Sequence, residues 1–134
     1  MKRFLSRFVA LALALVLSIG VMGCSNAPAG LSGNYSQDTL ALITTLRAAI
    51  DLPNDAPNKA QAQTDARELI NNFASRYQRD ASVTKLSSFT TMRTALNSLA
   101  GHYSSYPNRP VPQKLKTRLE QEFSQVESAL RRGS

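Results

Sequence analysis

The chain has 134 residues, a length typical of one domain, and 43% of them are apolar. Its 16 basic and 9 acidic residues give a formal net charge of +7, which falls to +4 without the three basic residues of the first seven positions. This excess is modest, and no motif for reading RNA or DNA occurs, so we expect no nucleic-acid partner.

The first 23 residues have the pattern of an export signal. Lys2, Arg3 and Arg7 precede a run over residues 8–19 that is apolar except for Ser18. This run of about twelve residues is too short for a permanent helix across roughly 30 Å of hydrocarbon. We predict that residues 1–23 are a cleaved signal peptide.

Cys24 is the only cysteine, which excludes an internal disulfide. With Val21, Met22 and Gly23 before it, the segment resembles a bacterial lipobox, in which the cysteine thiolate takes up a diacylglyceryl group. Met22 is a mild departure, because a smaller residue is more usual there. The alternative is an ordinary signal peptide that ends near a free cysteine. We predict lipidation at Cys24 and a flexible tether over residues 24–36, whose first part is rich in small residues.

Two helices are predicted in the first half of the remaining chain. The first covers residues 37–52, with Ser36 as its N-cap, and ends at a proline-containing stretch. The second covers residues 59–79, where Asn58 and Gln61 have the spacing of a capping box. Apolar residues recur in both at steps of three and four, namely Leu42, Ile43, Leu46, Ala49 and Ile50, then Ala62, Ala66, Leu69, Ile70, Phe73 and Tyr77.

Two more helices are predicted in the second half, over residues 85–104 and from Pro112 to a stop at Gly133. Their apolar seams are Phe89, Met92, Leu96, Leu99 and Tyr103, then Leu115, Leu119, Phe123, Val126 and Leu130. Four helices with one apolar stripe each bury those stripes against one another, and short connections place neighbours antiparallel. The predicted fold is all-α, an antiparallel up-down-up-down four-helix bundle over residues 37–134.

The residues needed for catalysis or metal binding are sparse. His102 is the only histidine, and we expect it to make a local structural hydrogen bond. Glu120 and Glu127 share a helix face. Lys116 lies four residues before Glu120 and Arg131 lies four residues after Glu127, which indicates plain i,i+4 ion pairs. We therefore expect no catalytic residues, no metal site and no cofactor.

The third predicted helix has an unusual surface, because Arg93 is the only formal charge between residues 86 and 106. We count Ser88 and Ala95 among the small residues that lie away from its core seam. Small uncharged side chains lose little on desolvation, which suits contact with another protein. The alternative is that Ser and Thr are simply acceptable surface residues. We name as a candidate docking face the low-charge stripe of Thr90, Arg93, Asn97, Gly101 and Ser104.

Particular segments resemble a known family. Ser-Phe-Thr-Thr-Met at residues 88–92 and Leu-Ala-Gly-His-Tyr at residues 99–103, together with residues 35–39, are similar to the small assembly and repair lipoproteins of photosystem II. The resemblance runs from the lipobox to residue 133. It implies a cyanobacterial protein anchored to the thylakoid membrane on its lumenal side, without enzymatic activity or cofactor.

The same resemblance implies a partner. Members of this family bind the large lumenal loop of an inner antenna chlorophyll-protein in immature photosystem II, and keep extrinsic subunits off until the manganese cluster is assembled. We expect a monomer when the protein is free. Two other classes stay open. One is a generic envelope lipoprotein that acts as scaffold or inhibitor of a non-photosynthetic partner, and the other is a hydrolase accessory or an enzyme whose site is not recognised.

Overall fold

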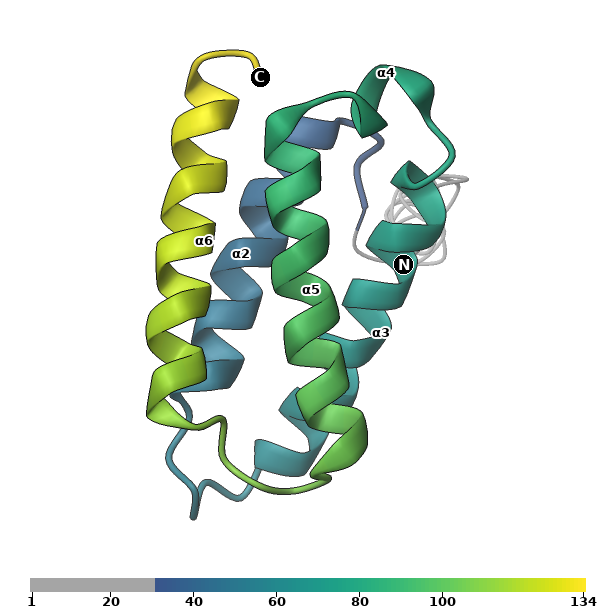
Figure 1. Cartoon of the computed structure of the whole chain (residues 1–134). Coiled ribbons are helices and arrows are strands. Elements are labelled where there is room, and N and C mark those ends of the chain that lie inside the picture. Colours follow the sequence, from purple (N-terminus) through teal and green to yellow (C-terminus); the bar gives the residue numbers. More distant parts are fainter. Residues whose placement is uncertain (1–30) are drawn as a thin grey trace, which may run out of the picture.

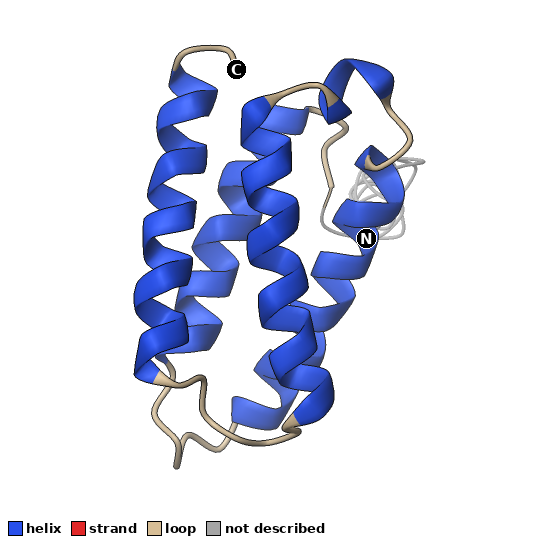
Figure 2. Cartoon of the chain, viewed as in Figure 1, coloured by secondary structure: helices blue, strands red, loops and turns tan. Residues whose placement is uncertain are grey.

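The computed structural model describes residues 31–134, so the predicted signal peptide, Cys24 and the first part of the predicted tether lie outside the described residues. Within them every regular element is a helix (Figures 1 and 2). The helices are α2 (Tyr35–Asp51), α3 (Lys59–Tyr77), α4 (Ala81–Thr84), α5 (Ser87–Ser105) and α6 (Gln113–Arg131).

Each of the four long helices packs against two others. Helix α5 contacts α6 and α3, and α2 contacts α3 and α6, so the four surround one core. Chain direction alternates from one long helix to the next, as Figure 1 shows. The predicted up-down-up-down bundle is confirmed. None of the helices in residues 31–134 combines the length and the apolar character needed to cross a bilayer.

Helix α2 begins earlier than predicted because a different residue caps it. The N-cap is Asn34, whose side-chain oxygen accepts a hydrogen bond of 3.0 Å from the backbone N–H of Gln37. Ser36, the predicted cap, lies inside the helix. An asparagine two residues upstream serves equally well as a cap, so composition alone did not decide between them.

The predicted capping box of α3 does not form. Asn58 occupies the N-cap position, but its side chain makes no capping hydrogen bond. The Gln61 side chain instead donates to Asp65 Oδ1 at 2.8 Å, one turn further along. The helix ends at Tyr77, two residues before the predicted end.

A short helix that the periodicity did not reveal separates α3 from α5. Asp80 caps α4 by accepting hydrogen bonds from the backbone N–H and the hydroxyl of Ser82, at 3.0 and 2.6 Å. The side chain of Val83 in α4 is buried in the core, and α5 begins at Ser87. Four residues are too few to show a helical period, so α4 could not be predicted from the spacing of apolar residues.

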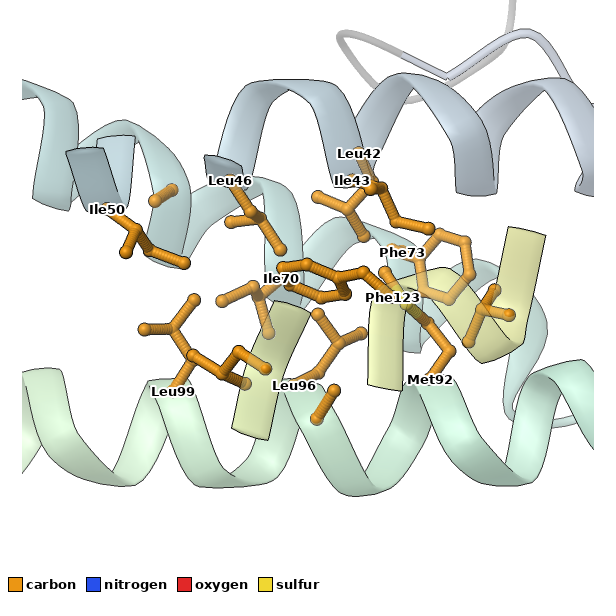
Figure 3. Packing of buried hydrophobic residues seen from close by; sticks show 14 of the residues in the cluster. Leu42, Ile43, Leu46, Ile50, Ile70, Phe73, Met92, Leu96, Leu99 and Phe123 are labelled. Carbon is orange, nitrogen blue, oxygen red and sulfur yellow. The ribbon is translucent and has the colours of Figure 1, made fainter. Parts of the chain in front are cut away.

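The predicted core positions largely fill the bundle centre, as the close view in Figure 3 shows. All five seam residues of α5 are at most 4% exposed. Four predicted stripe residues at the margin are only partly buried: Ala62, Leu69, Leu115 and Leu130.

The buried face of α5 is wider than its seam. Ser88 and Ala95, which we placed away from the core, are both fully buried. A helix that packs between two neighbours buries positions beside the a/d seam as well, and small side chains fit there. The Ser88 hydroxyl is satisfied, since it lies 2.8 Å from the hydroxyl of Tyr35.

Candidate functional site

The low-charge stripe lies on the outer face of α5. Thr90, Arg93, Asn97, Gly101 and Ser104 are all exposed, so the structure brings them together on one solvent-facing surface. A side chain at Gly101 would meet no atom within 4 Å, which means that packing within the chain does not require glycine there. The stripe is thus an exposed surface whose one formal charge, Arg93, lies one turn from its start.

Hydroxyl groups on and beside the stripe donate hydrogen bonds to backbone carbonyl oxygens one turn earlier in the chain. Thr94 and Ser98 each donate to the carbonyl oxygen four residues earlier, at 3.1 Å, and Thr90 does so at 3.4 Å. A hydroxyl group that already hydrogen-bonds to the backbone has a smaller desolvation penalty when a partner displaces the surrounding water. This lowers the free-energy cost of covering the face with another protein.

His102 lies at the far end of α5, half-buried beside two tyrosines. Its ring centroid is 6.0 Å from that of Tyr103 and 5.5 Å from that of Tyr106. Its Nε2 is buried and has no hydrogen-bond partner among residues 31–134, so the expected local hydrogen bond is not made by this atom. The imidazole ring lies beside these two aromatic rings.

A buried carboxylate organises the end of the bundle where the described chain begins. Asp38, in the first turn of α2, is 3% exposed. It accepts hydrogen bonds from the backbone N–H and hydroxyl of Ser32, at 2.7 and 2.6 Å, and from Gly33 N–H at 3.2 Å. The hydroxyl of Tyr77, from the end of α3, donates to the same carboxylate. Residues 32–33, which we assigned to the tether, are therefore fixed to the bundle.

The Asp38 cluster changes the titration of both its acidic groups. Burial raises the pKa of the Asp38 carboxyl, but the hydrogen bonds from Ser32, Tyr77 and Gly33 outweigh it, so the net pKa is below the usual value. Burial and the adjacent carboxylate both raise the pKa of Tyr77 above its ordinary value. At neutral pH the Asp38 carboxylate is therefore charged and accepts a hydrogen bond from the neutral phenol of Tyr77.

Further contacts tie the other helices into this end. The Tyr35–Ser88 hydroxyl pair joins the start of α2 to the start of α5, and Ser88 N–H donates to the Ser134 carbonyl oxygen at 3.1 Å, beyond the end of α6. We call this the tether end: the start of α2, the end of α3, α4, the start of α5 and the end of α6. It is the upper end in Figure 1.

An arginine joins α2 to α6 on another side of the bundle. Arg47 places two nitrogens 2.6 and 3.0 Å from the carboxylate of Glu120, and Nη1 lies 2.5 Å from Glu127 Oε1. Its guanidinium carbon lies 5.9 Å from the ring centroid of Phe123. This geometry overturns the i,i+4 pairing that we expected for these glutamates with Lys116 and Arg131.

The pairing differs from the expected one because the side chain of Arg47 reaches both glutamates from α2. Glu120 and Glu127 lie two turns apart on the face of α6 that meets α2, and a planar guanidinium can bridge both. The i,i+4 ion pair that α6 does make joins Arg118 to Glu122, at 2.9 Å. A surface hollow of about 760 Å³ lies beside Arg47 between α2 and α6.

Both groups of carboxylates are engaged by partners within the bundle. The glutamates are paired with Arg47, and the Asp38 carboxylate is enclosed by its donors. In residues 31–134 no three His, Cys, Asp or Glu side chains gather where they could hold a metal ion. The exposed α5 face and the charged surfaces remain as candidate sites of interaction.

Comparison with known proteins decides the family. The model of the family described as Photosystem II Pbs27 matches residues 3–130. The chain belongs to this family. The match covers nearly the whole sequence and confirms the resemblance inferred from residues 35–39, 88–92 and 99–103.

Individual members of the family show the same relationship. The chain is 60% identical over 130 residues to the Photosystem II assembly factor lipoprotein Psb27 of Thermosynechococcus vestitus, covering 96% of this chain and 97% of that protein. It is 56% identical over 133 residues to the Photosystem II lipoprotein Psb27 of a Synechocystis species, covering 99% and 97%.

Solved structures of the family share the fold. The solution structure of Psb27 from cyanobacterial photosystem II, 57% identical in sequence, superposes with a TM-score of 0.75 over 84% of this chain and 97% of that one. The crystal structure of PSB27 from Arabidopsis thaliana, 35% identical, gives 0.72 over 75% and 98%. The helical bundle is thus a property of the family.

Proposed function

We propose that this chain is a non-catalytic assembly and repair factor that binds the lumenal side of immature photosystem II. The observation that carries the proposal is identity of 60% and 56%, over nearly the full length, to proteins named as a photosystem II assembly factor lipoprotein and a photosystem II lipoprotein. The described part of the chain offers an exposed, low-charge surface for contact, which is consistent with such a role.

The proposed partner is the large lumenal loop of an inner antenna protein in the photosystem II core. By occupying this region, the bundle would keep extrinsic subunits away until the manganese cluster is assembled, and would then leave. The proposed docking face is the low-charge stripe of α5. Its exposure and the internally satisfied hydroxyls of Thr90, Thr94 and Ser98 support it.

The proposed location is the lumenal surface of the thylakoid membrane, with Cys24 as the lipidated residue. The lipobox-like sequence at residues 21–24 supports this, and the two cyanobacterial relatives carry the word lipoprotein in their names. The free protein is proposed to be a monomer that needs no cofactor.

A pull-down tests the function. The full chain with a C-terminal tag is expressed in a cyanobacterium and captured from solubilised thylakoid membranes, and the bound proteins are identified by mass spectrometry. We expect reaction-centre and inner antenna subunits of photosystem II, with the extrinsic subunits depleted. Capture of envelope proteins without photosystem II subunits would favour the generic lipoprotein instead, and would overturn the proposal.

A further inference from the structure

Exposed basic side chains gather at the tether end. Five arginine and lysine residues lie there, all exposed: Arg76, Arg79, Lys85, Arg131 and Arg132. They come from three separate stretches of the chain, which the Asp38–Tyr77 and Ser88–Ser134 contacts hold at one end of the bundle. We call this group the basic end.

Helix stability explains only part of this cluster. Arg76 and Arg131 lie in the last turns of α3 and α6, where positive charge stabilises the helix dipole. Arg79 and Lys85 lie outside the long helices, in the connections on either side of α4, and Arg132 follows the last residue of α6. No salt bridge is formed by these three within residues 31–134. Their charge is available to a partner.

The net charge of the chain is concentrated at this end. The tether end holds these five basic residues and two acidic ones, Asp38 and Asp80, of which Asp38 is buried. The other eight basic and seven acidic residues of positions 24–134 nearly cancel. Three of the four net positive charges therefore lie at the tether end.

The start of the described chain lies at the same end. Ser32 is fixed to Asp38, and eight residues separate it from Cys24, so the two positions are at most about 29 Å apart. The opposite end of the bundle is about 28 Å further away along the 19-residue helices. A lipid on Cys24 would therefore attach the bundle to the bilayer from its basic end, which is the nearer of the two ends along the chain.

We propose that the basic end docks on anionic lipid head groups, so that the bundle stands on the membrane with its helices directed away from it. An acyl anchor combined with a polybasic patch binds membranes more stably than either alone. In this orientation the low-charge stripe, which runs along α5, faces sideways towards a neighbouring membrane complex. This orientation of the bundle rests on the proposed lipid anchor at Cys24. The binding of the basic end to lipid head groups does not, so it can be tested on a chain without the lipid.

Vesicle binding without the lipid tests the proposal. The chain from residue 24 with Cys24→Ser contains every described helix and the whole core, and is sedimented with vesicles of phosphatidylcholine, with or without one third phosphatidylglycerol. We expect binding to the anionic vesicles only, and loss of binding in molar salt, where the Debye length falls to about 3 Å. Equal binding to both vesicle types would overturn the proposal.

A matched pair of double variants locates the contact. Arg79→Gln with Arg132→Gln removes two charges from the basic end, and Arg109→Gln with Lys114→Gln removes two exposed charges from the opposite end. We expect the first pair to weaken binding to anionic vesicles about 25-fold, at roughly fivefold for each residue, and the second to leave it nearly unchanged.

Two outcomes would contradict this assignment. Equal weakening by both pairs would mean that overall charge, and not the basic end, attracts the vesicles. Parental vesicle binding by the first pair, with loss of its binding to photosystem II cores, would show that the basic end contacts a protein partner instead. Failure of the parent chain to bind photosystem II would count against the proposed function and leave the vesicle result standing.

Discussion

The hydroxyl of Tyr77 at the end of α3 donates a hydrogen bond to the Asp38 carboxylate in the first turn of α2. The same carboxylate accepts hydrogen bonds from Ser32 and Gly33, so one buried charge joins two helices and the segment that leads into them. Because the carboxylate is buried, its charged form depends on these hydrogen-bond donors for stabilisation. The cluster fixes the point at which the chain enters the bundle.

Stability should depend on the charge of Asp38. We predict that Asp38→Asn lowers the free energy of unfolding by about 1–3 kcal/mol at neutral pH, because a hydrogen-bonded buried charge is lost. The pKa of Asp38 is lower in the folded chain than in the unfolded chain. Its stabilising contribution is therefore present above the unfolded pKa of about 3.9 and is lost as pH falls through the folded pKa.

Urea unfolding of the parent and of Asp38→Asn over a pH series measures this. The difference between the two should be largest near neutral pH and should shrink once the pH falls below about 4. A difference that stays constant from neutral to acid pH would show that the carboxylate charge is not what stabilises the tether end.

The Arg47 bridge should be sensitive to the shape of the cation. Arg47→Lys keeps the charge but cannot contact both carboxylates in the same way, so we predict a loss of roughly 0.5–1 kcal/mol in the free energy of unfolding. The control is Arg118→Lys, whose partner Glu122 lies on the same helix, and which should change stability by less than about 0.5 kcal/mol. Equal effects in thermal unfolding would mean that the α2–α6 bridge contributes nothing particular.

The aromatic core should contribute strongly to stability. Phe123 is 1% exposed at the centre of α6, and we predict that Phe123→Ala costs about 3–5 kcal/mol. Tyr106, at 54% exposure, is the matched control, and Tyr106→Ala should cost about 0.5 kcal/mol or less. A thermal midpoint for Phe123→Ala close to that of Tyr106→Ala would contradict the packing in Figure 3.

Membrane attachment should depend on Cys24. We predict that Cys24→Ser in the full chain is not lipidated, is left uncut or is cut elsewhere, and is recovered in the soluble fraction after cell lysis. Mass spectrometry of the parent should find the acyl groups on residue 24. Partition of the variant into membranes to the same extent as the parent, at high salt, would reject the lipobox.

The fold was predictable because each long helix carries an apolar stripe with a clear period. The five seam residues of α5 from Phe89 to Tyr103 are all buried, as their spacing predicted. Local features were less predictable, since Asn34 and Ser36 are both good caps and only the structure shows which one is used. The burial of Ser88 depends on Tyr35, which lies 53 positions earlier in the sequence.

The candidate interaction surfaces were predictable only where the sequence signal lies within one helix. The low-charge stripe could be seen because its residues recur along one helix. The Asp38–Tyr77 pair and the basic end combine residues from separate helices, and no pattern within a single segment brings them together. The Arg47 bridge was missed for the same reason, because Lys116 and Arg131 offered nearer partners in the sequence than Arg47 did.

The most direct test is the affinity of the purified chain for photosystem II cores that lack their extrinsic subunits. We predict saturable binding by the parent, and binding weakened tens-fold or more by Thr90→Glu with Asn97→Glu, because each unpaired charge must be desolvated in the contact. Both substitutions lie on the exposed face, so circular dichroism should show an intact fold. Parental affinity in the folded double variant would contradict the docking face, and a parent chain that does not bind these cores would contradict the proposed function itself.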